Sequence, residues 1–195
     1  KIKKIIHKGQ VNASKHFIKS VEECIIKNQN TPISVVEIGV DRGASTYPVS
    51  KLLRKGDRYD LFDVNNCPLA KELDKIKSSS LCDIYFWGNS TKEHDSYAWS
   101  LAKMYINLSS IKQGVDLPLW DVVYLDGAHT FNIDATSTAI IKKMVKVGGL
   151  IIFDDMDWTM EGSPTCNNSS NWKKYTNEQM KTSHVALIVN VLMRD

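Results

Sequence analysis

Apolar, strand-like runs alternate with helix-like segments along most of the chain, and this alternation constrains the fold more than any other feature. It predicts a doubly wound α/β domain, because consecutive parallel strands need a crossover connection and a helix usually supplies it. The five predicted strands lie at residues 33–38, 59–63, 81–87, 120–125 and 149–153. Helices are predicted at residues 13–28, 45–55, 67–78, 96–110, 131–146 and about 172–182.

The last third of the chain carries three weaker signals. The helix before the fifth strand is expected to end in the Lys-Val-Gly-Gly of residues 146–149, since a basic residue in the last turn and glycine beyond it are typical of a helix end. Residues 161–171 are rich in Gly, Ser, Pro, Asn and Thr and predict a surface loop. The apolar run at 184–193 predicts one more strand.

Composition indicates a single soluble domain over residues 1–195, with 43% hydrophobic and 24% charged residues and no internal repeat. The net charge of +3 is too small to indicate a nucleic-acid partner. The four cysteines are widely spaced, which favours reduced thiols of a cytoplasmic protein over a zinc site or a disulfide framework. Neither a membrane span nor a signal peptide is expected. The chain begins with Lys1, so we expect the natural start to lie upstream.

The stretch at residues 35–46 runs from a strand through a glycine-bearing turn into a helix. Gly39 and Gly43 permit backbone conformations that side chains forbid and let a ligand approach closely. Ser45 stands near the helix N-terminus, where a carboxylate or hydroxyl can bind. Asp41 occupies the place of a glycine in a dinucleotide fingerprint, and its charge would repel a pyrophosphate. We therefore predict a cofactor without phosphate, such as S-adenosylmethionine; the alternative is an ordinary tight turn.

Polar residues end each of the five predicted strands, and the carboxyl ends of parallel strands meet at the ligand-binding edge of the sheet. Asp63 lies about twenty residues beyond Gly43, where an acidic side chain accepts the hydroxyls of a ribose; the alternative is a solvated aspartate. The full set of strand-end residues is Glu37 and Gly39, Asp63, Gly88 with Asn89 and Ser90, Asp126, and Asp154 with Asp155.

These motifs together resemble the class I S-adenosylmethionine-dependent methyltransferases over about residues 30–158. The resemblance is carried by Glu-Ile-Gly-x-x-x-Gly-x-Ser from Glu37, Asp63, Gly-Asn-Ser at 88–90 and Leu-Asp-Gly-Ala-His at 125–129. It is greatest to the metal-dependent O-methyltransferases related to catechol O-methyltransferase and to the group that methylates sugars and other natural products. It implies that Gly39, Asp41, Gly43 and Ser45 surround the methionine part of the cofactor, with Glu37 and Asp126 beside it. Asp63 would hold the ribose, and Asn89 and Ser90 would border the adenine.

The same resemblance implies a metal site at Asp126, Asp154 and Asp155, where carboxylates at neighbouring strand ends would suit Mg²⁺. The catechol-type enzymes have an asparagine at the position of Asp155. His129 stands where those enzymes carry a lysine, and a neutral imidazole there would accept the proton of the acceptor hydroxyl, with Asp126 as the second catalytic residue. The alternatives are that the aspartates cap helices and that His129 binds backbone.

The sequence therefore predicts a methyltransferase acting on a hydroxyl of a small molecule, either catechol-like or a sugar, with Mg²⁺. Two other functions stay open: a metal-independent RNA or protein methyltransferase, and a non-catalytic S-adenosylmethionine-binding module. Trp158 is a candidate wall of the acceptor pocket, which the N-terminal helix and the 161–171 loop would also shape. The class usually ends in an antiparallel hairpin, so we expect the strand at 184–193 to be antiparallel. Its partner strand is either hidden or lost by truncation, and a homodimer would cover the open edge.

Overall fold

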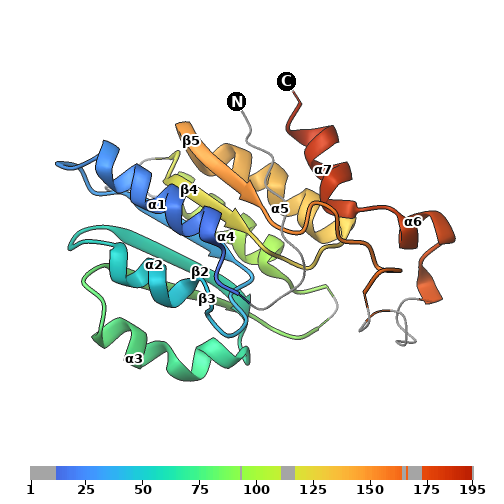
Figure 1. Cartoon of the computed structure of the whole chain (residues 1–195), viewed down its shortest axis with the longest axis horizontal. Coiled ribbons are helices and arrows are strands. Elements are labelled where there is room, and N and C mark those ends of the chain that lie inside the picture. The colour runs from blue at the N-terminus through green and yellow to red at the C-terminus, as the bar shows by residue number, and fades with distance from the viewer. Residues whose placement is uncertain (1–11, 93, 111–116, 164–165, 167–172, 195) are drawn as a thin grey trace.

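The computed structural model describes residues 12–92, 94–110, 117–163, 166 and 173–194, in which helices flank one sheet (Figure 1). The strand order is β3-β2-β1-β4-β5, and all four strand pairs are parallel. The strands are β1 Ser34–Ile38, β2 Arg58–Val64, β3 Asp83–Asn89, β4 Trp120–Leu125 and β5 Val145–Phe153. Because the winding reverses between β1 and β4, the sheet is doubly wound, as predicted.

Helices cover both faces of the sheet. On one face α1, α2, η1 and α3 pack in one apolar core, and on the other α4, α5 and α7 pack in a second. Adjacent residues of β1 divide between the two, with Val35 in the first core and Val36 in the second. None of the described helices is long and apolar enough to span a membrane. The helices are α1 Lys15–Lys27, α2 Thr46–Leu52, the 3-10 helix η1 Pro68–Glu72, α3 Leu73–Ser78, α4 Tyr97–Ser110, α5 Phe131–Met144, α6 Asn177–Lys181 and α7 His184–Leu192.

The last apolar run is a helix, so the predicted antiparallel strand at 184–193 is wrong. α7 begins after Ser183, whose hydroxyl accepts a hydrogen bond from the backbone N–H of Ala186. Its buried residues Val185 and Ile188 recur at helical spacing and pack in the same core as α5. The β-branched composition favoured a strand, but the helix cap and the burial of one helix face outweigh it. Within the described residues the sheet therefore has five strands.

Residues 146–149 do not end a helix, which corrects a second prediction. α5 already ends at Met144, and β5 begins at the next residue. Trp120 pairs with Val145, whereas Val122 pairs with Leu150, so the residues between them form an irregularity in the strand. Gly148 has a φ of 80°, which favours glycine. Gly148 and Gly149 thus belong to a bulge in the edge strand β5.

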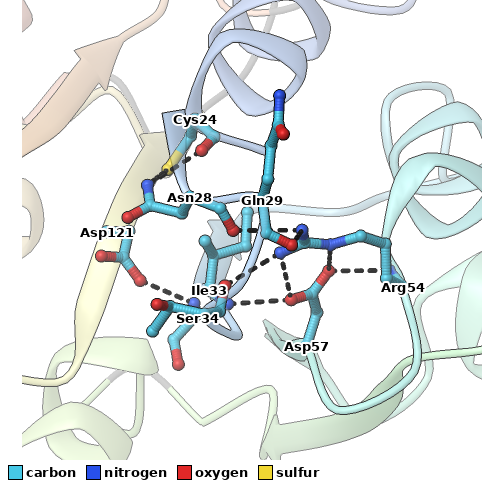
Figure 2. A network of polar contacts seen from close by, with 9 residues as sticks. Cys24, Asn28, Gln29, Ile33, Ser34, Arg54, Asp57 and Asp121 are labelled. Atoms are coloured by element: carbon cyan, nitrogen blue, oxygen red, sulfur yellow. Dashed lines mark hydrogen bonds and ion pairs between the residues drawn. The ribbon is translucent and has the colours of Figure 1, made fainter. Parts of the chain in front are cut away.

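A polar network fixes the amino-terminal edge of the sheet (Figure 2). The Asp57 carboxylate, which is 1% exposed, accepts hydrogen bonds from the backbone N–H groups of Ile33 at 2.8 Å and Arg54 at 2.7 Å. The Arg54 guanidinium pairs with the same carboxylate and donates to the carbonyl oxygens of Asn28 and Thr31. The network joins the end of α1, the start of β1 and the turn before β2. It therefore stabilises the edge of the sheet opposite the predicted site.

Candidate active site

A cavity of about 1280 Å³ lies at the carboxyl ends of the strands. Residues at the carboxyl ends of all five strands line it, and residues 12–15 at the start of α1 contribute one wall. Ligands of doubly wound sheets bind at this edge. A pocket for one small ligand usually has a volume of about 300–1000 Å³. The cavity therefore has room for a cofactor and a second molecule.

The glycine turn after β1 forms the floor of this cavity. Gly39 and Gly43 have φ values of 85° and 80°, as the sequence predicted for residues that need glycine. A Cβ atom at Gly39 would collide with the carbonyl oxygen of Asp126, so the turn packs directly on the end of β4. Asp41 also has a positive φ, of 41°, and its exposed side chain lines the cavity. The turn is thus held in one conformation that presents backbone to a ligand.

Asp63 holds the glycine turn as well as lining the cavity. Its Oδ2 atom accepts hydrogen bonds from the backbone N–H groups of Val40 and Asp41, both at 2.8 Å. Its Oδ1 atom accepts one from the N–H of Val64 at 2.6 Å. An ionised carboxylate has about four acceptor positions, so one position remains for a ribose hydroxyl. Asp63, which is predicted to bind the ribose, therefore also has a structural role that the sequence did not indicate.

Glu37 lies beneath the turn and is 2% exposed. Its Oε2 atom accepts hydrogen bonds from the hydroxyl of Thr46 at 2.8 Å and from that of Tyr59. Burial raises the pKa of Glu37 from 4.5 to about 8, although both hydrogen bonds lower it; the charges of Asp126 and Asp63 raise it further. Glu37 is therefore protonated at neutral pH while the cavity holds no cation.

The predicted adenine and methionine contacts lie at two other walls of the cavity. Asn89 is 5% exposed, and its Oδ1 atom has no hydrogen-bond partner among the described residues, so the atom is available to a ligand that donates. The backbone N–H of Ser90 donates to Asp95 at 2.8 Å. The hydroxyl of Ser45 accepts from the backbone N–H of Ser14 at 2.8 Å, which ties the start of α1 to the turn. Ser45 keeps its own hydroxyl proton for a ligand.

Two aspartates and a histidine converge at the far wall, after β4 and β5. The Nε2 atom of His129 lies 3.2 Å from Oδ1 of Asp126 and 3.7 Å from Oδ2 of Asp155. One ligand atom from each of the three residues lies within 4.8 Å of the other two. Asp154 lines the same cavity, but its Oδ2 atom accepts a hydrogen bond from Tyr124 at 2.5 Å. The predicted metal ligands Asp126 and Asp155 thus lie beside His129, while Asp154 is hydrogen-bonded to Tyr124.

The charges of this cluster shift the pKa values of two of its members. Burial lowers the pKa of His129, but the hydrogen bond and the charge of Asp126 and the charge of Asp155 together raise it above 6.5. Burial raises the pKa of Asp155 to about 6, and the charges of Asp154 and Asp126 add to this, while His129 opposes it. Without another cation, the two carboxylates therefore favour the charged form of His129.

Tyr97 and Asp134 support the loop before His129, and sequence reasoning missed both. The Tyr97 hydroxyl donates to Asp134 and accepts from the backbone N–H of Ala128 at 2.6 Å. A Cβ atom at Gly127 would collide with this pair, which explains the glycine of the Asp-Gly-Ala-His motif. Tyr97 begins α4 and Asp134 lies in the first turn of α5, so only the fold brings them together.

The expected pocket walls are present in part. Residues 12–15, which precede and begin α1, line the cavity, as predicted for the N-terminal helix. Trp158 packs its ring against His129, with 5.2 Å between the ring centroids, so it lies beside the cluster. Most of the predicted loop at 161–171 lies outside the described residues.

Comparison with known proteins defines the class. The model of a family described as a methyltransferase domain matches residues 36–156, more than half of the chain, and the chain belongs to this family. No curated protein matches the sequence. The O-methyltransferase of Bacillus cereus, solved with S-adenosylhomocysteine, has a TM-score of 0.59 at 14% identity, and the match covers 96% of this chain and 73% of that one. A methyltransferase of Podospora anserina with bound S-adenosylhomocysteine has a TM-score of 0.52 at 13% identity, with 95% and 72% covered.

The family match and the fold confirm the sequence-based recognition of a class I, S-adenosylmethionine-dependent methyltransferase. The fold places every predicted cofactor residue in the glycine turn or on the cavity wall. The roles predicted for the individual residues stay predictions.

Proposed function

We propose that this protein transfers the methyl group of S-adenosylmethionine to a hydroxyl group of a small molecule, with a divalent cation bound beside the acceptor. The observation that carries the proposal is a single cavity with the glycine turn on its floor and with Asp126 and Asp155 at one wall, where His129 lies beside both carboxylates. A cofactor on the turn would direct its reactive end toward that wall. The acceptor would occupy the remaining space.

The electrostatics of the cavity favour a cationic cofactor. Among the described residues, seven acidic and three basic side chains line it, and the basic ones are all exposed. S-adenosylmethionine carries a positive sulfonium, which supplies an activated methyl group, and a positive ammonium. Glu37, Asp63 and Asp126 would offset these charges. The residues then contribute mainly alignment, which raises the rate by removing the entropic cost of bringing donor and acceptor together.

The donor set at the wall fits a divalent cation. Asp126 and Asp155 offer carboxylate oxygens and His129 an imidazole nitrogen, and all three side chains are half-buried. A bound cation would supply a Lewis acid that lowers the pKa of a hydroxyl. Asp154 and Tyr124 would hold the neighbouring edge of the acceptor pocket. Trp158 would limit the pocket beyond His129. Catechol-like phenols and sugars both present a hydroxyl of this kind.

The acidic cavity argues against the two other functions. A nucleic-acid methyltransferase needs basic side chains for phosphates, whereas acidic side chains predominate in this cavity. A non-catalytic binding module has no need of half-buried carboxylates that repel one another beside the cofactor. Methyl transfer to RNA or protein that persists with a chelator would support the first alternative.

The test is methyl transfer from labelled S-adenosylmethionine to a panel of catechols and sugars. Each reaction is run with Mg²⁺, with Mn²⁺ and with a chelator, and the product is identified as a methyl ether by mass spectrometry and NMR. We expect transfer only with a cation and none in Asp126→Asn, with Asp157→Asn as the matched control. Binding of S-adenosylhomocysteine without transfer to any hydroxyl acceptor would instead support a binding module.

A further inference from the structure

The Nε2 atom of His129 is directed at two carboxylates, 3.2 Å from Asp126 and 3.7 Å from Asp155. This nitrogen and the two carboxylate oxygens form a group small enough to surround one ion.

The fold holds the imidazole in this orientation from several sides. His129 itself has a φ of 54°, and Asp155 has one of 50°, a region that residues other than glycine rarely adopt. The Trp158 ring packs against the imidazole. Below it, Asp134 accepts a hydrogen bond from the N–H of Ala128 and so fixes the preceding peptide. The ring is therefore positioned before any ligand binds.

Asp154 is a poorer third ligand than His129. Its carboxylate already accepts a short hydrogen bond from Tyr124, whose hydroxyl also lies 3.4 Å from Oδ2 of Asp126. Ligation by this Asp154 oxygen would require that the bond from the buried Tyr124 hydroxyl be given up. His129 would need only to exchange its contact with the carboxylates for a bond to a cation between them.

We propose that Asp126, His129 and Asp155 hold the cation, and that the site consequently prefers a first-row transition-metal ion such as Fe²⁺ or Co²⁺ to Mg²⁺. The inference rests on the proposed function, of which it specifies the metal. Mg²⁺ is bound almost entirely by oxygen, whereas imidazole nitrogen suits first-row transition metals. His129 is then a metal ligand, and its lone pair is not available to accept the acceptor's proton.

The test uses Mn²⁺ as a paramagnetic probe. Its binding to the whole protein is measured by calorimetry and by pulsed electron paramagnetic resonance. We expect one tightly bound Mn²⁺ per chain, whose spectrum shows coupling to a directly bound ¹⁴N nucleus. His129→Ala should remove this coupling and weaken Mn²⁺ binding by roughly tenfold or more, since loss of even a residue that only supports a ligand costs that much. His129→Asp should restore binding without the nitrogen coupling and lower the ratio of Mn²⁺ to Mg²⁺ affinity.

Two matched variants serve as controls. One removes a nearby negative charge, and the other removes a histidine that lies outside the cluster. Asp157→Asn changes an exposed carboxylate two residues from Asp155, and His94→Ala removes an exposed histidine outside the cluster. Both should bind Mn²⁺ with unchanged affinity and retain the nitrogen coupling. Circular dichroism and thermal unfolding show whether each variant is folded.

A wild-type Mn²⁺ spectrum without nitrogen coupling, or unchanged Mn²⁺ affinity in His129→Ala, would overturn the ligation by His129. Methyl transfer that persists in that case leaves the proposed function intact. A third outcome is that no Mn²⁺ binds to the wild type while S-adenosylhomocysteine does, so that the three side chains hold no cation. That result would overturn both this proposal and the cation in the proposed function, but not the methyltransferase.

Discussion

Glu37→Gln should stabilise the protein in a strongly pH-dependent way. The carboxyl group lies in the floor of the cavity, where it contacts Thr46 and Tyr59 and has only the like charges of Asp63 and Asp126 nearby. Burial raises its pKa from 4.5 to about 8. Since the folded pKa exceeds the unfolded one, its favourable contribution is complete below pH 4.5 and is lost as the pH rises through about 8.

The magnitude follows from linkage. Each pH unit in this window costs about 1.4 kcal/mol of unfolding free energy, because the unfolded chain releases a proton that the folded chain retains. Between about pH 5 and pH 7 the loss is about 2.5 kcal/mol. Glutamine keeps the shape and an oxygen that accepts from Thr46 and Tyr59, but it has no proton to lose. The variant should therefore gain that amount relative to the wild type over the same pH range.

The assay is urea unfolding of both proteins at several pH values, without cofactor or metal. Only the difference between the two proteins matters, because the other titrating groups are common to both. Glu22→Gln on the exposed face of α1 is the matched control and should show no pH-dependent difference. A Glu37→Gln effect that stays constant from pH 5 to pH 7 would refute the reasoning, since Glu37 would then titrate alike in both states.

Three further substitutions test the turn and the sheet edge. Gly39→Ala should abolish S-adenosylhomocysteine binding in calorimetry, because its Cβ meets the carbonyl of Asp126, whereas Gly148→Ala, at a similar φ with open space around it, should bind normally. Asp63→Ala should weaken the same binding by roughly tenfold or more, because two backbone N–H groups of the turn lose their acceptor at a net cost of about 1 kcal/mol each; an unchanged dissociation constant would contradict its role. Asp57→Ala should lower the urea-unfolding free energy by about 2–5 kcal/mol, because two buried N–H groups are left unpaired, and a loss below about 1 kcal/mol would contradict this.

The strands and the ligand-binding edge were predictable from the sequence because their signals are local. The apolar run of β1 predicted a strand, and the two glycines of the turn predicted positive φ values. The structure has both. Asp63 lies near the end of β2, Asp126 and Asp155 follow β4 and β5, and parallel strands bring their carboxyl ends together whatever packs around them. Their position in the cavity could therefore be predicted from the strand boundaries alone.

α7 shows where a local signal can mislead. Its β-branched residues favour a strand, but its buried residues Val185 and Ile188 recur at helical spacing, and Ser183 is a good N-cap. This helical signal was present in the sequence and was outweighed by composition. Leu187 and Val191 are apolar but exposed, so hydrophobicity alone did not distinguish an amphipathic helix from a strand.

The partners inside the site were not predictable. The hydroxyl of Tyr124 binds Asp154, and that of Tyr97 binds Asp134, across separations of 30 and 37 residues. Such contacts depend on how helices pack over the sheet and leave no pattern in the sequence. The bond from Tyr124 occupies an oxygen of Asp154, so the choice among the proposed cation ligands depends on a contact that only the structure shows.

The central claim is that this one cavity holds S-adenosylmethionine with its sulfur beside the Asp126 cluster. A crystal structure with S-adenosylhomocysteine and Mn²⁺ tests it most directly. We expect the homocysteine part on the Gly39 turn, the ribose at Asp63, the adenine at Asn89 and the sulfur facing the cation. A cofactor bound elsewhere, or one in this cavity with its sulfur directed away from Asp126, would contradict it.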